Sequence, residues 1–368
     1  MRPAGRLSAI LLVTTSLVLS GCEHERSLNA PDMSTLAPRL QVSFEKMKSV
    51  CFGRFLVDVP ASAAVVWGHA SMELGVDFYP AGANQVMDMA KAFSENLKNT
   101  HAIHLDNIPI FLAEEEITQP PGTIISGLEG FDAINGLKIE GYFRWGGEGL
   151  VISARPLRED RADTIAEMKS IVRRLRRRDE NEVPREAGNC LEYAFLADKS
   201  MTGNKTPIEH VRIGFRLKEF PDTHLSIYIG PSNPHYSEGN SLEWQLARLE
   251  ERQRAEDPNH PLLQTKYFRR GERKIHQWLN GWEAVSRSPD RDGFHGTHEF
   301  VMHVRGVPKD VYKPYANIQM QTGIKGNTAG AIKPTLTDEE AVAVWDRITS
   351  SIRVRPTSSA PSNANDKG

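Results

Sequence analysis

The sequence predicts an α+β fold with two similar domains, each an antiparallel sheet with helices packed on one face. Two observations predict this class. Segments rich in strand-forming residues occur in runs between amphipathic helices, which is the order expected of antiparallel sheets covered by helices. The second half of the chain then repeats the order of elements in the first half. The composition, 39% hydrophobic and 25% charged residues, is that of an ordinary globular protein.

The first domain is expected at residues 47–178. Its strands are predicted from apolar and β-branched residues, some alternating with polar ones, at residues 50–60, 71–79, 108–114, 123–132, 137–145 and 150–154. A helix is predicted at residues 84–98, because the apolar residues from Val86 to Leu97 share one helical face. A second helix, at residues 161–177, closes the domain.

A charged segment at residues 179–189 is predicted to be a linker, and the second domain is expected at residues 190–355. Its strands are predicted at residues 190–196, 211–217, 224–229, 267–278, 297–305 and 316–322. One helix is predicted at residues 241–254. Another begins at Thr337, which forms a capping box with Glu340.

Two further matches indicate an internal duplication. The strand that opens the second domain carries Cys190, as the first strand of the first domain carries Cys51. The tetrapeptide at residues 281–284 also resembles the one at residues 130–133. Beyond the second domain, residues 356–368 are rich in Ser, Pro and Asn and are predicted to be a disordered tail.

The N-terminal segment has the layout of a secretory signal. Arg2 and Arg6 precede an apolar run at residues 8–19. This run is shorter than the roughly 20 residues that a membrane-spanning helix needs, so residues 1–21 are predicted to be an export signal. The sequence Leu19-Ser20-Gly21-Cys22 resembles a bacterial lipobox, in which the cysteine is acylated and becomes the new N-terminus. An ordinary cleaved signal is the alternative.

Lipidation of Cys22 would place the mature protein in the periplasm, with the membrane as a partner through the lipid anchor. Residue 23 is Glu, not the Asp that resembles an inner-membrane retention signal, so the outer membrane is favoured over the inner one. Residues 22–46 are mostly polar and contain two prolines. They are predicted to be a flexible tether.

The chain has three cysteines, and Cys51 and Cys190 remain if Cys22 is lipidated. An even pair in an oxidising compartment is a disulfide candidate. Two buried free thiols are the alternative, because the sequence does not give the distance between the two Cα atoms.

The chain lacks the short motifs of common catalytic sites. It contains no Gly-x-Ser-x-Gly, no phosphate-binding loop, no Gly-x-Gly-x-x-Gly and no His-Glu-x-x-His. We therefore predict a protein that is not an enzyme, with no catalytic residues and no cofactor. The net charge of −2 provides no field that would attract nucleic acid.

The best metal-ligand candidates are His295, His298, Glu299 and His303. A regular strand would place His298 on the face opposite Glu299 and His303, so no metal site is predicted. Residues 290–293, with Glu299, have part of the spacing of a calcium-binding loop. That loop needs flanking helices, whereas strands are predicted on both sides here, so a hairpin turn is favoured.

The strongest run of charge is residues 173–178, which holds five arginines and one leucine. Such a run can bind acidic lipid or an acidic partner. It also lies at the end of a predicted helix, where cations interact favourably with the helix dipole. The second explanation is favoured.

Residues 48–60 carry a resemblance to a known family. The matching residues are Cys51, Gly53, Arg54, Asp58 and Pro60. They resemble the opening of the N-terminal domain in type VI secretion immunity proteins that neutralise the fourth class of antibacterial phospholipase effectors. Cys190 and the final helix, at residues 345–353, resemble the second domain of that family.

This resemblance implies an inhibitor of two α+β domains that grips a phospholipase and blocks either its substrate access or its lid motion. It supplies no short binding motif, so the partner-binding residues are unknown. Among the aromatic residues, Trp145, Tyr236 and Trp244 are predicted to be exposed candidates. The main alternative is a structural or assembly lipoprotein of the envelope, and a periplasmic hydrolase or metal binder is a third hypothesis. A lipase-like gene adjacent to this one would favour the first hypothesis.

Overall fold

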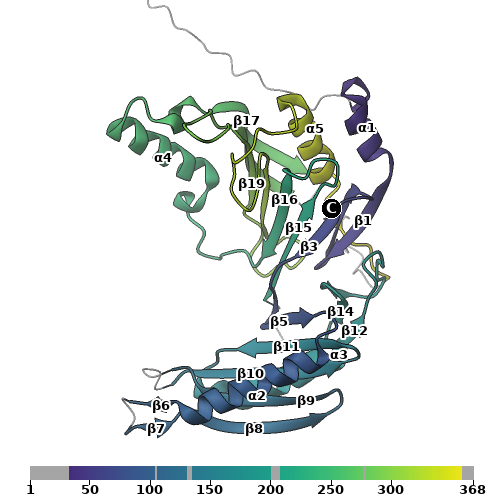
Figure 1. The fold of residues 1–368 in the computed structure, drawn as a ribbon, viewed down its shortest axis with the longest axis vertical. Helices are drawn as coiled ribbons and strands as arrows, with labels where there is room; N and C mark the ends of the chain where they lie inside the picture. Colours follow the sequence, from purple (N-terminus) through teal and green to yellow (C-terminus); the bar gives the residue numbers. More distant parts are fainter. Residues whose placement is uncertain (1–32, 104–105, 131–134, 200–207, 277–278, 359–368) are drawn as a thin grey trace, which may run out of the picture.

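The computed structural model describes residues 33–358, except for residues 104–105, 131–134, 200–207 and 277–278. The predicted export signal and Cys22 lie outside these residues. Two lobes lie one above the other in Figure 1. The lower lobe is built mainly from residues 70–177. The upper lobe is built from residues 33–67 and 209–355.

One antiparallel sheet runs through both lobes. In the lower lobe its strands are, in spatial order, β4 (Ala70–Met72), β5 (Leu74–Tyr79), β11 (Glu148–Ala154), β10 (Leu137–Trp145), β9 (Pro121–Leu128) and β8 (Phe111–Thr118). In the upper lobe they are β15 (Glu209–Arg216), β16 (His224–Gly230), β20 (Tyr315–Gln321), β19 (His298–Val304), β18 (Leu279–Arg287) and β17 (Lys266–Ile275). Pairing between β15 and β4 joins the two halves, with Glu209 opposite Met72.

The strand order is the same in both lobes. Each half runs from an inner strand through a helix, four antiparallel strands and a second helix to a short closing strand. This shared topology is what the predicted duplication requires. The tetrapeptide match was wrong as evidence for it, however. Gly281 lies inside β18, whose counterpart β9 ends at Leu128, before Gly130; residues 131–133 lie outside the described residues.

Helices lie on both faces of the lower sheet, which differs from the predicted single face. Helix α2 (Ala83–Asn99) contacts Glu114 of β8 through Ser94 at 2.7 Å, and helix α3 (Arg161–Arg174) contacts the adjacent Glu115 through Lys169 at 2.6 Å. Because neighbouring strand residues point to opposite faces, the two helices cover opposite faces. In the upper lobe, helix α5 (Asp338–Thr349) covers one face and packs Trp345 against Phe300.

The hairpin that opens each repeat pairs with the strand that closes the other repeat. The first hairpin, β1 (Met47–Phe52) and β2 (Phe55–Pro60), pairs with β21 (Arg353–Val354). The second hairpin, β13 (Gly188–Cys190) and β14 (Ala194–Ala197), pairs with β12 (Leu175–Arg177). The two halves of the sequence therefore exchange hairpins in space.

The segment at residues 38–45, expected within a flexible tether, forms helix α1 (Pro38–Glu45). Pro38 stands in the first turn, where proline is tolerated, and Leu40 and Phe44 are buried in the upper lobe. The predicted helix at 161–177 also ends earlier, at Arg174, because the next three residues form β12. The remaining elements are β3 (Ala64–Trp67), β6 (His101–Ala102), β7 (Ile108–Pro109), α4 (Leu242–Glu256) and the 3-10 helices Met33–Thr35, Arg158–Asp160, Glu238–Asn240 and Pro261–Gln264.

Apolar side chains from both lobes and from the exchanged first hairpin form one hydrophobic core. Trp345 is fully buried, and its indole N–H donates to Glu283 Oε2 at 3.0 Å. None of the helices among the described residues is both long and apolar enough to span a membrane.

Candidate functional site

The two hairpins meet at a joint between the lobes. Cys51 and Cys190 are fully buried there and form a disulfide, with Cα atoms 5.7 Å apart. Gly53 and Cys190 also exchange two backbone hydrogen bonds of 2.8 Å. Gly53 has a φ of +52°, a left-handed conformation that favours glycine, and a Cβ atom there would also approach the terminal methyl group of Ile229 to 2.9 Å.

Arg54 is the main cation of this joint. Its side chain is 4% exposed and forms ion pairs with Asp198 at 2.7 Å and Glu209 at 2.5 Å. Burial lowers the pKa of Arg54, but hydrogen bonds to the two carboxylates outweigh burial and raise this pKa above its ordinary value. Arg54 thus connects the first hairpin to segments that lie in the second half of the sequence.

The other two motif residues hold the first hairpin in the upper lobe. The carboxylate of Asp58 accepts hydrogen bonds from Ser49 at 2.5 Å and from Arg353 of β21 at 2.8 and 3.0 Å. Pro60 ends β2, and its carbonyl accepts a hydrogen bond from the Ala63 N–H at 2.9 Å. Three of the residues that carry the family resemblance, Cys51, Gly53 and Arg54, therefore build the joint, while Asp58 and Pro60 fix the first hairpin in the upper lobe.

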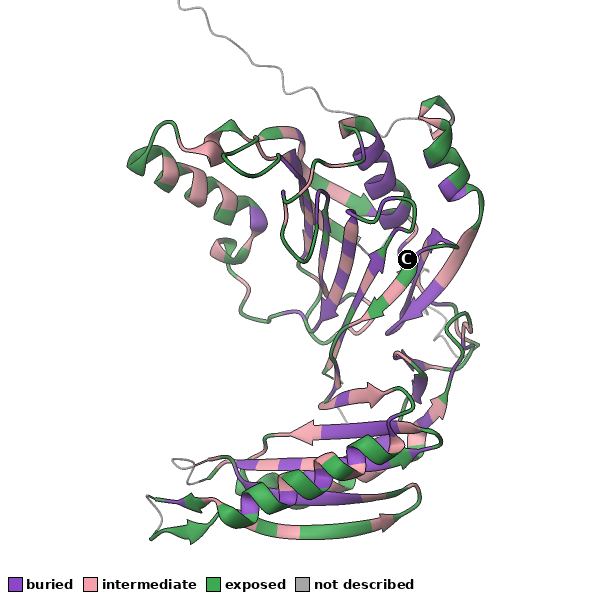
Figure 2. Ribbon diagram, in the orientation of Figure 1, coloured by how far each residue is buried: buried purple, intermediate pink, exposed green. Residues whose placement is uncertain are grey.

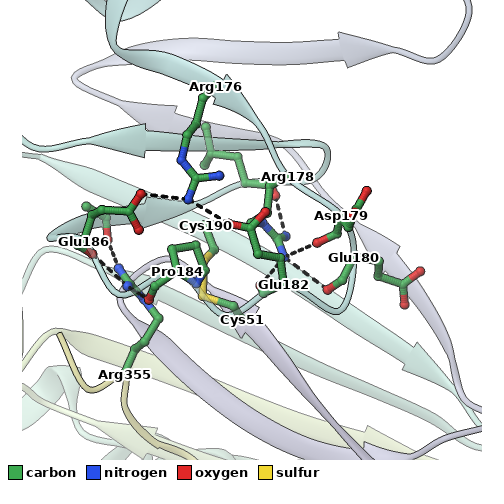
Figure 3. The surroundings of a disulfide bond; sticks show 12 residues. Cys51, Arg176, Arg178, Asp179, Glu180, Glu182, Pro184, Glu186, Cys190 and Arg355 are labelled. Atoms are coloured by element: carbon green, nitrogen blue, oxygen red, sulfur yellow. Dashed lines mark hydrogen bonds and ion pairs between the residues drawn. A yellow bond between two sulfur atoms is a disulfide. The ribbon is translucent and has the colours of Figure 1, made fainter. Parts of the chain in front are cut away.

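The linker at residues 179–189 is bound by two buried arginines (Figure 3). Arg178 donates to the carbonyls of Asp179, Glu180 and Glu182 at 3.1 Å each and to that of Leu191 at 2.8 Å. Arg355 donates to the carbonyls of Pro184, Glu186 and Gly188. Burial lowers the pKa of Arg178 to about 10 and also lowers that of Arg355.

Sequence reasoning missed Arg355 and placed Arg178 only in a general charge run. A signal existed, because each of these arginines directly follows the closing strand of a repeat. Their backbone N–H groups also donate to equivalent hairpin turns, Arg178 to Tyr193 at 3.0 Å and Arg355 to Arg54 at 2.9 Å. Alignment of the two repeats would have singled them out.

The other arginines of the 173–178 run with described contacts pair within the protein. Arg174 binds Glu167 at 3.1 Å, Arg176 binds Glu182 at 2.7 Å, and Arg177 binds Glu148 at 3.1 Å. These pairs support the structural explanation of the run over binding to acidic lipid.

The upper sheet has one open face, and Figure 2 shows partly exposed residues alternating with buried ones along β15 and β16. We define the open face as the side of β15, β16, β20 and β19 that is turned away from α5. Its members are Arg212, Arg216, Tyr228, Tyr315, Asn317, Gln319, Glu299, Val301 and His303, each exposed or half-buried. Cross-strand pairing places Tyr228 opposite Asn317 and His303 opposite Asn317 from the other side. The face is thus a continuous surface of mixed polar and aromatic character.

The three aromatic residues that were predicted to be exposed differ in their exposure to solvent. Trp145 is buried, 9% exposed, and packs against Phe78 with ring centroids 5.7 Å apart, so the prediction for Trp145 was wrong. Tyr236 is half-buried beneath the Arg305 guanidinium, 4.7 Å from its ring. Trp244 is 41% exposed on α4.

The metal-ligand candidates do not converge. His298 is fully buried and contacts Thr322 at 2.8 Å and Asp338 at 3.1 Å, whereas Glu299 is exposed on the opposite face of β19. Burial lowers the pKa of both His298 and His303. Across the described part of the chain, no group of three or more His, Cys, Asp or Glu side chains is placed to hold a metal ion.

The segment with partial calcium-loop spacing forms a turn between two strands. Asp290 accepts a hydrogen bond from the Gly296 N–H at 2.6 Å, and Ser288 pairs with Thr297 across the turn. Asp290 and Ser288 therefore stabilise the turn itself, as polar residues commonly do in turns.

The fold and the joint define the chain as a two-domain α+β protein whose halves repeat the same order of strands and helices and exchange their hairpins. Residues 48–178 match the family model for the N-terminal domain of Tle cognate immunity protein 4, and residues 182–357 match the model for its C-terminal domain. The chain therefore belongs to the Tle cognate immunity protein 4 family.

Solved structures share this fold at low sequence identity. A structure described as the Tle4–Tli4 complex has a TM-score of 0.68 at 18% identity, with 85% of this chain and 98% of that chain covered. The apo structure of the immunity protein TplEi of Pseudomonas aeruginosa has a TM-score of 0.65 at 18% identity, over 85% and 98% of the two chains. The structure of TplEi with a peptide has a TM-score of 0.62 at 19% identity, over 84% and 99%. No curated protein matches the sequence significantly.

Proposed function

We propose that this chain is a periplasmic, lipid-anchored immunity protein that binds and occludes a cognate type VI secretion phospholipase effector, and so protects the cell that makes it. The observation that carries the proposal is the match of both halves to the two domains of the immunity family. One similar solved structure is described as a complex of Tle4 with Tli4, so a protein of this fold has been observed bound to such a partner.

Two features support the periplasmic location. The N-terminal sequence has the layout of an export signal, followed by the lipobox-like Leu19-Ser20-Gly21-Cys22. The buried disulfide between Cys51 and Cys190 is also typical of an oxidising compartment.

Inhibition by occlusion needs a broad surface and no catalytic group of its own. A stable interface buries more than about 1,000 Å² and depends on a few aromatic or arginine anchors. Two lobes fixed at one joint can contact a partner at separated places, which increases the buried area without any movement of the chain.

A rescue experiment tests the proposal. The candidate effector, a Tle4-class phospholipase from the organism that encodes this chain, is directed to the periplasm of a sensitive host, with and without this protein and with a Cys22→Ala variant. We expect survival only when the exported wild-type protein is present, and reduced survival with Cys22→Ala. Death despite confirmed export would contradict the proposal and favour the structural lipoprotein.

A further inference from the structure

The two repeats differ in how a helix covers one face of the sheet. In the lower lobe, α2 lies across β9, β10 and β11, with Val86, Ala90 and Leu97 buried. Its counterpart α4 lies at the edge of the upper sheet, against β18, and only Leu242 of this helix is buried. Glu250 of α4 reaches β17 through Tyr267 and Arg270, at 2.9 and 2.8 Å. Figures 1 and 2 show α4 standing away from the sheet with a largely exposed surface.

The displacement of α4 leaves the open face of the upper sheet without the helix that its counterpart carries. The face of the lower sheet that α2 covers also carries polar and aromatic residues. Phe93 of α2 packs on Tyr142 with ring centroids 6.1 Å apart, and the Lys138 ammonium lies 4.7 Å from the Phe93 ring. The first repeat thus shows a helix packed on the equivalent face of its sheet, where the helix also covers the apolar residues Ile125 and Val151.

The charge of the open face is one-sided. Arg212 and Arg216 are exposed on β15, and Arg305 is exposed directly after β19. Among the described residues of the four strands, Glu299 is the only acidic residue on this face. The Arg212 guanidinium lies over the Tyr228 ring at 5.1 Å, which holds this cation against the surface. Arginine and tyrosine are the residue types that most often anchor interfaces. Acidic side chains would complement this surface.

We propose that the open face of the upper sheet binds a helix of the effector that carries acidic side chains, in the place that α2 takes in the first repeat. This inference rests on the proposed function. The helix lies across β16, β20 and β19, with its apolar residues on Tyr228 and Val301 and its carboxylates toward Arg212 and Arg216. Helix docking onto a complementary surface is a common mode of recognition.

The test uses this protein, purified without residues 1–21, and the purified candidate effector, the same Tle4-class phospholipase as in the rescue experiment. Arg212→Glu reverses a charge on the open face, and Gln319→Trp places a large side chain at its exposed centre. Arg347→Glu is the matched control, because Arg347 is exposed on α5, which covers the opposite face. We expect the dissociation constant to rise at least tenfold for both face variants, with an unchanged melting temperature, and to stay within twofold for the control.

A photo-crosslinking residue at position 319 identifies the occupant directly and does not depend on the folding of either variant. We expect the crosslink to fall on a helical, acid-rich segment of the effector. A crosslink to a basic or extended effector segment, to α4, or to a second copy of this chain would overturn the inference.

The two proposals fail in different ways. If the wild-type chain binds the effector and both face variants bind equally well, the open-face inference is overturned and the immunity function stands. If the wild-type chain neither binds the effector nor protects the host, both are overturned. Binding that weakens with added salt in the wild type, and less so in Arg212→Glu, would support the role of charge.

Discussion

At the scale of single residues, Arg54 and Arg353 offer a direct comparison of two ion pairs built on the family motif. Arg54 is 4% exposed and is shared by Asp198 and Glu209, whereas Arg353 is 35% exposed and pairs with Asp58, which is 31% exposed. Loss of one partner from a buried pair leaves an uncompensated charge, while an exposed pair contributes little.

We predict that Arg54→Met lowers the free energy of unfolding by about 3 kcal/mol, because the carboxylates of Glu209 and Asp198 then lie at the joint without their cation. Arg353→Met, the control, should lower it by no more than about 1 kcal/mol. Urea denaturation of both variants measures the difference. Equal losses would contradict the central role assigned to Arg54.

The pair formed by buried His298 and half-buried Asp338 makes stability depend on pH. Burial lowers the pKa of His298 from its ordinary 6.5, and this effect outweighs the hydrogen bond to Asp338. Burial opposes ionisation of Asp338, but hydrogen bonds from Lys266, His298 and Arg287 lower its pKa to about 2. In both cases the unfolded chain binds a proton more readily than the folded chain, so stability falls as the pH falls.

For His298 the stabilising contribution is full above pH 6.5 and declines below it; for Asp338 it is full above pH 3.8 and is lost toward pH 2. We predict a lower free energy of unfolding at pH 5 than at pH 7.5. His298→Gln should reduce this difference, because one of the protons taken up on unfolding is removed. The surface variant His295→Gln is the control. A difference that is unchanged in His298→Gln would show that other groups cause the pH dependence.

At the scale of elements, the helices with a strong apolar face could be predicted from the sequence. The helix expected at 84–98 is α2 (Ala83–Asn99), and the capping box at Thr337 starts α5 as expected. Helix α4 is the exception, because its apolar residues Leu246 and Leu249 are only half-buried. Periodicity reports which residues prefer to be buried, but it does not report whether the sheet offers a place for them.

The joint could be predicted only in part. The motif drew attention to Cys51, Gly53 and Arg54, but their partners lie far away in the sequence. Arg54 binds Asp198 and Glu209, at separations of 144 and 155 residues. No local pattern indicates such pairs, and the exchange of hairpins depends on them. Residues 38–45 were missed for a similar reason, since Leu40 is buried only because the upper lobe lies beside it.

The linker provides a prediction for one element. Arg178 holds the carbonyls of residues 179, 180 and 182, so cleavage there requires the segment to open first. We predict that Arg178→Met increases the rate of cleavage after Glu180 and Glu182 by a Glu-specific protease about tenfold. Arg177→Met, at an exposed neighbour that pairs with Glu148, should leave the rate unchanged. Equal rates in the two variants would show that Arg178 does not restrain the linker.

At the scale of the whole molecule, the exchange of hairpins makes the two repeats depend on each other. Within the described chain, β1 and β2 pair with β21, and β13 and β14 pair with β12, so each lobe contains strands from both halves of the sequence. The disulfide joins equivalent positions of the two hairpins, Cys51 and Cys190, which are separated by 139 positions in the sequence. The lobes are therefore fixed by covalent, backbone and ionic contacts at the same joint.

This topology predicts that a chain cut within the linker stays assembled. After cleavage between residues 180 and 186, the halves should elute together in gel filtration under both oxidising and reducing conditions, because the exchanged strands and Arg54 hold them without the disulfide. Reduction alone should lower the free energy of unfolding of the uncut chain by about 2–5 kcal/mol.

Each half expressed alone lacks the strands that complete its lobe and should show no cooperative unfolding, whereas co-expression of the two halves should restore cooperative unfolding. Independent folding of residues 47–178 would mean that the exchanged hairpins are not required for either lobe.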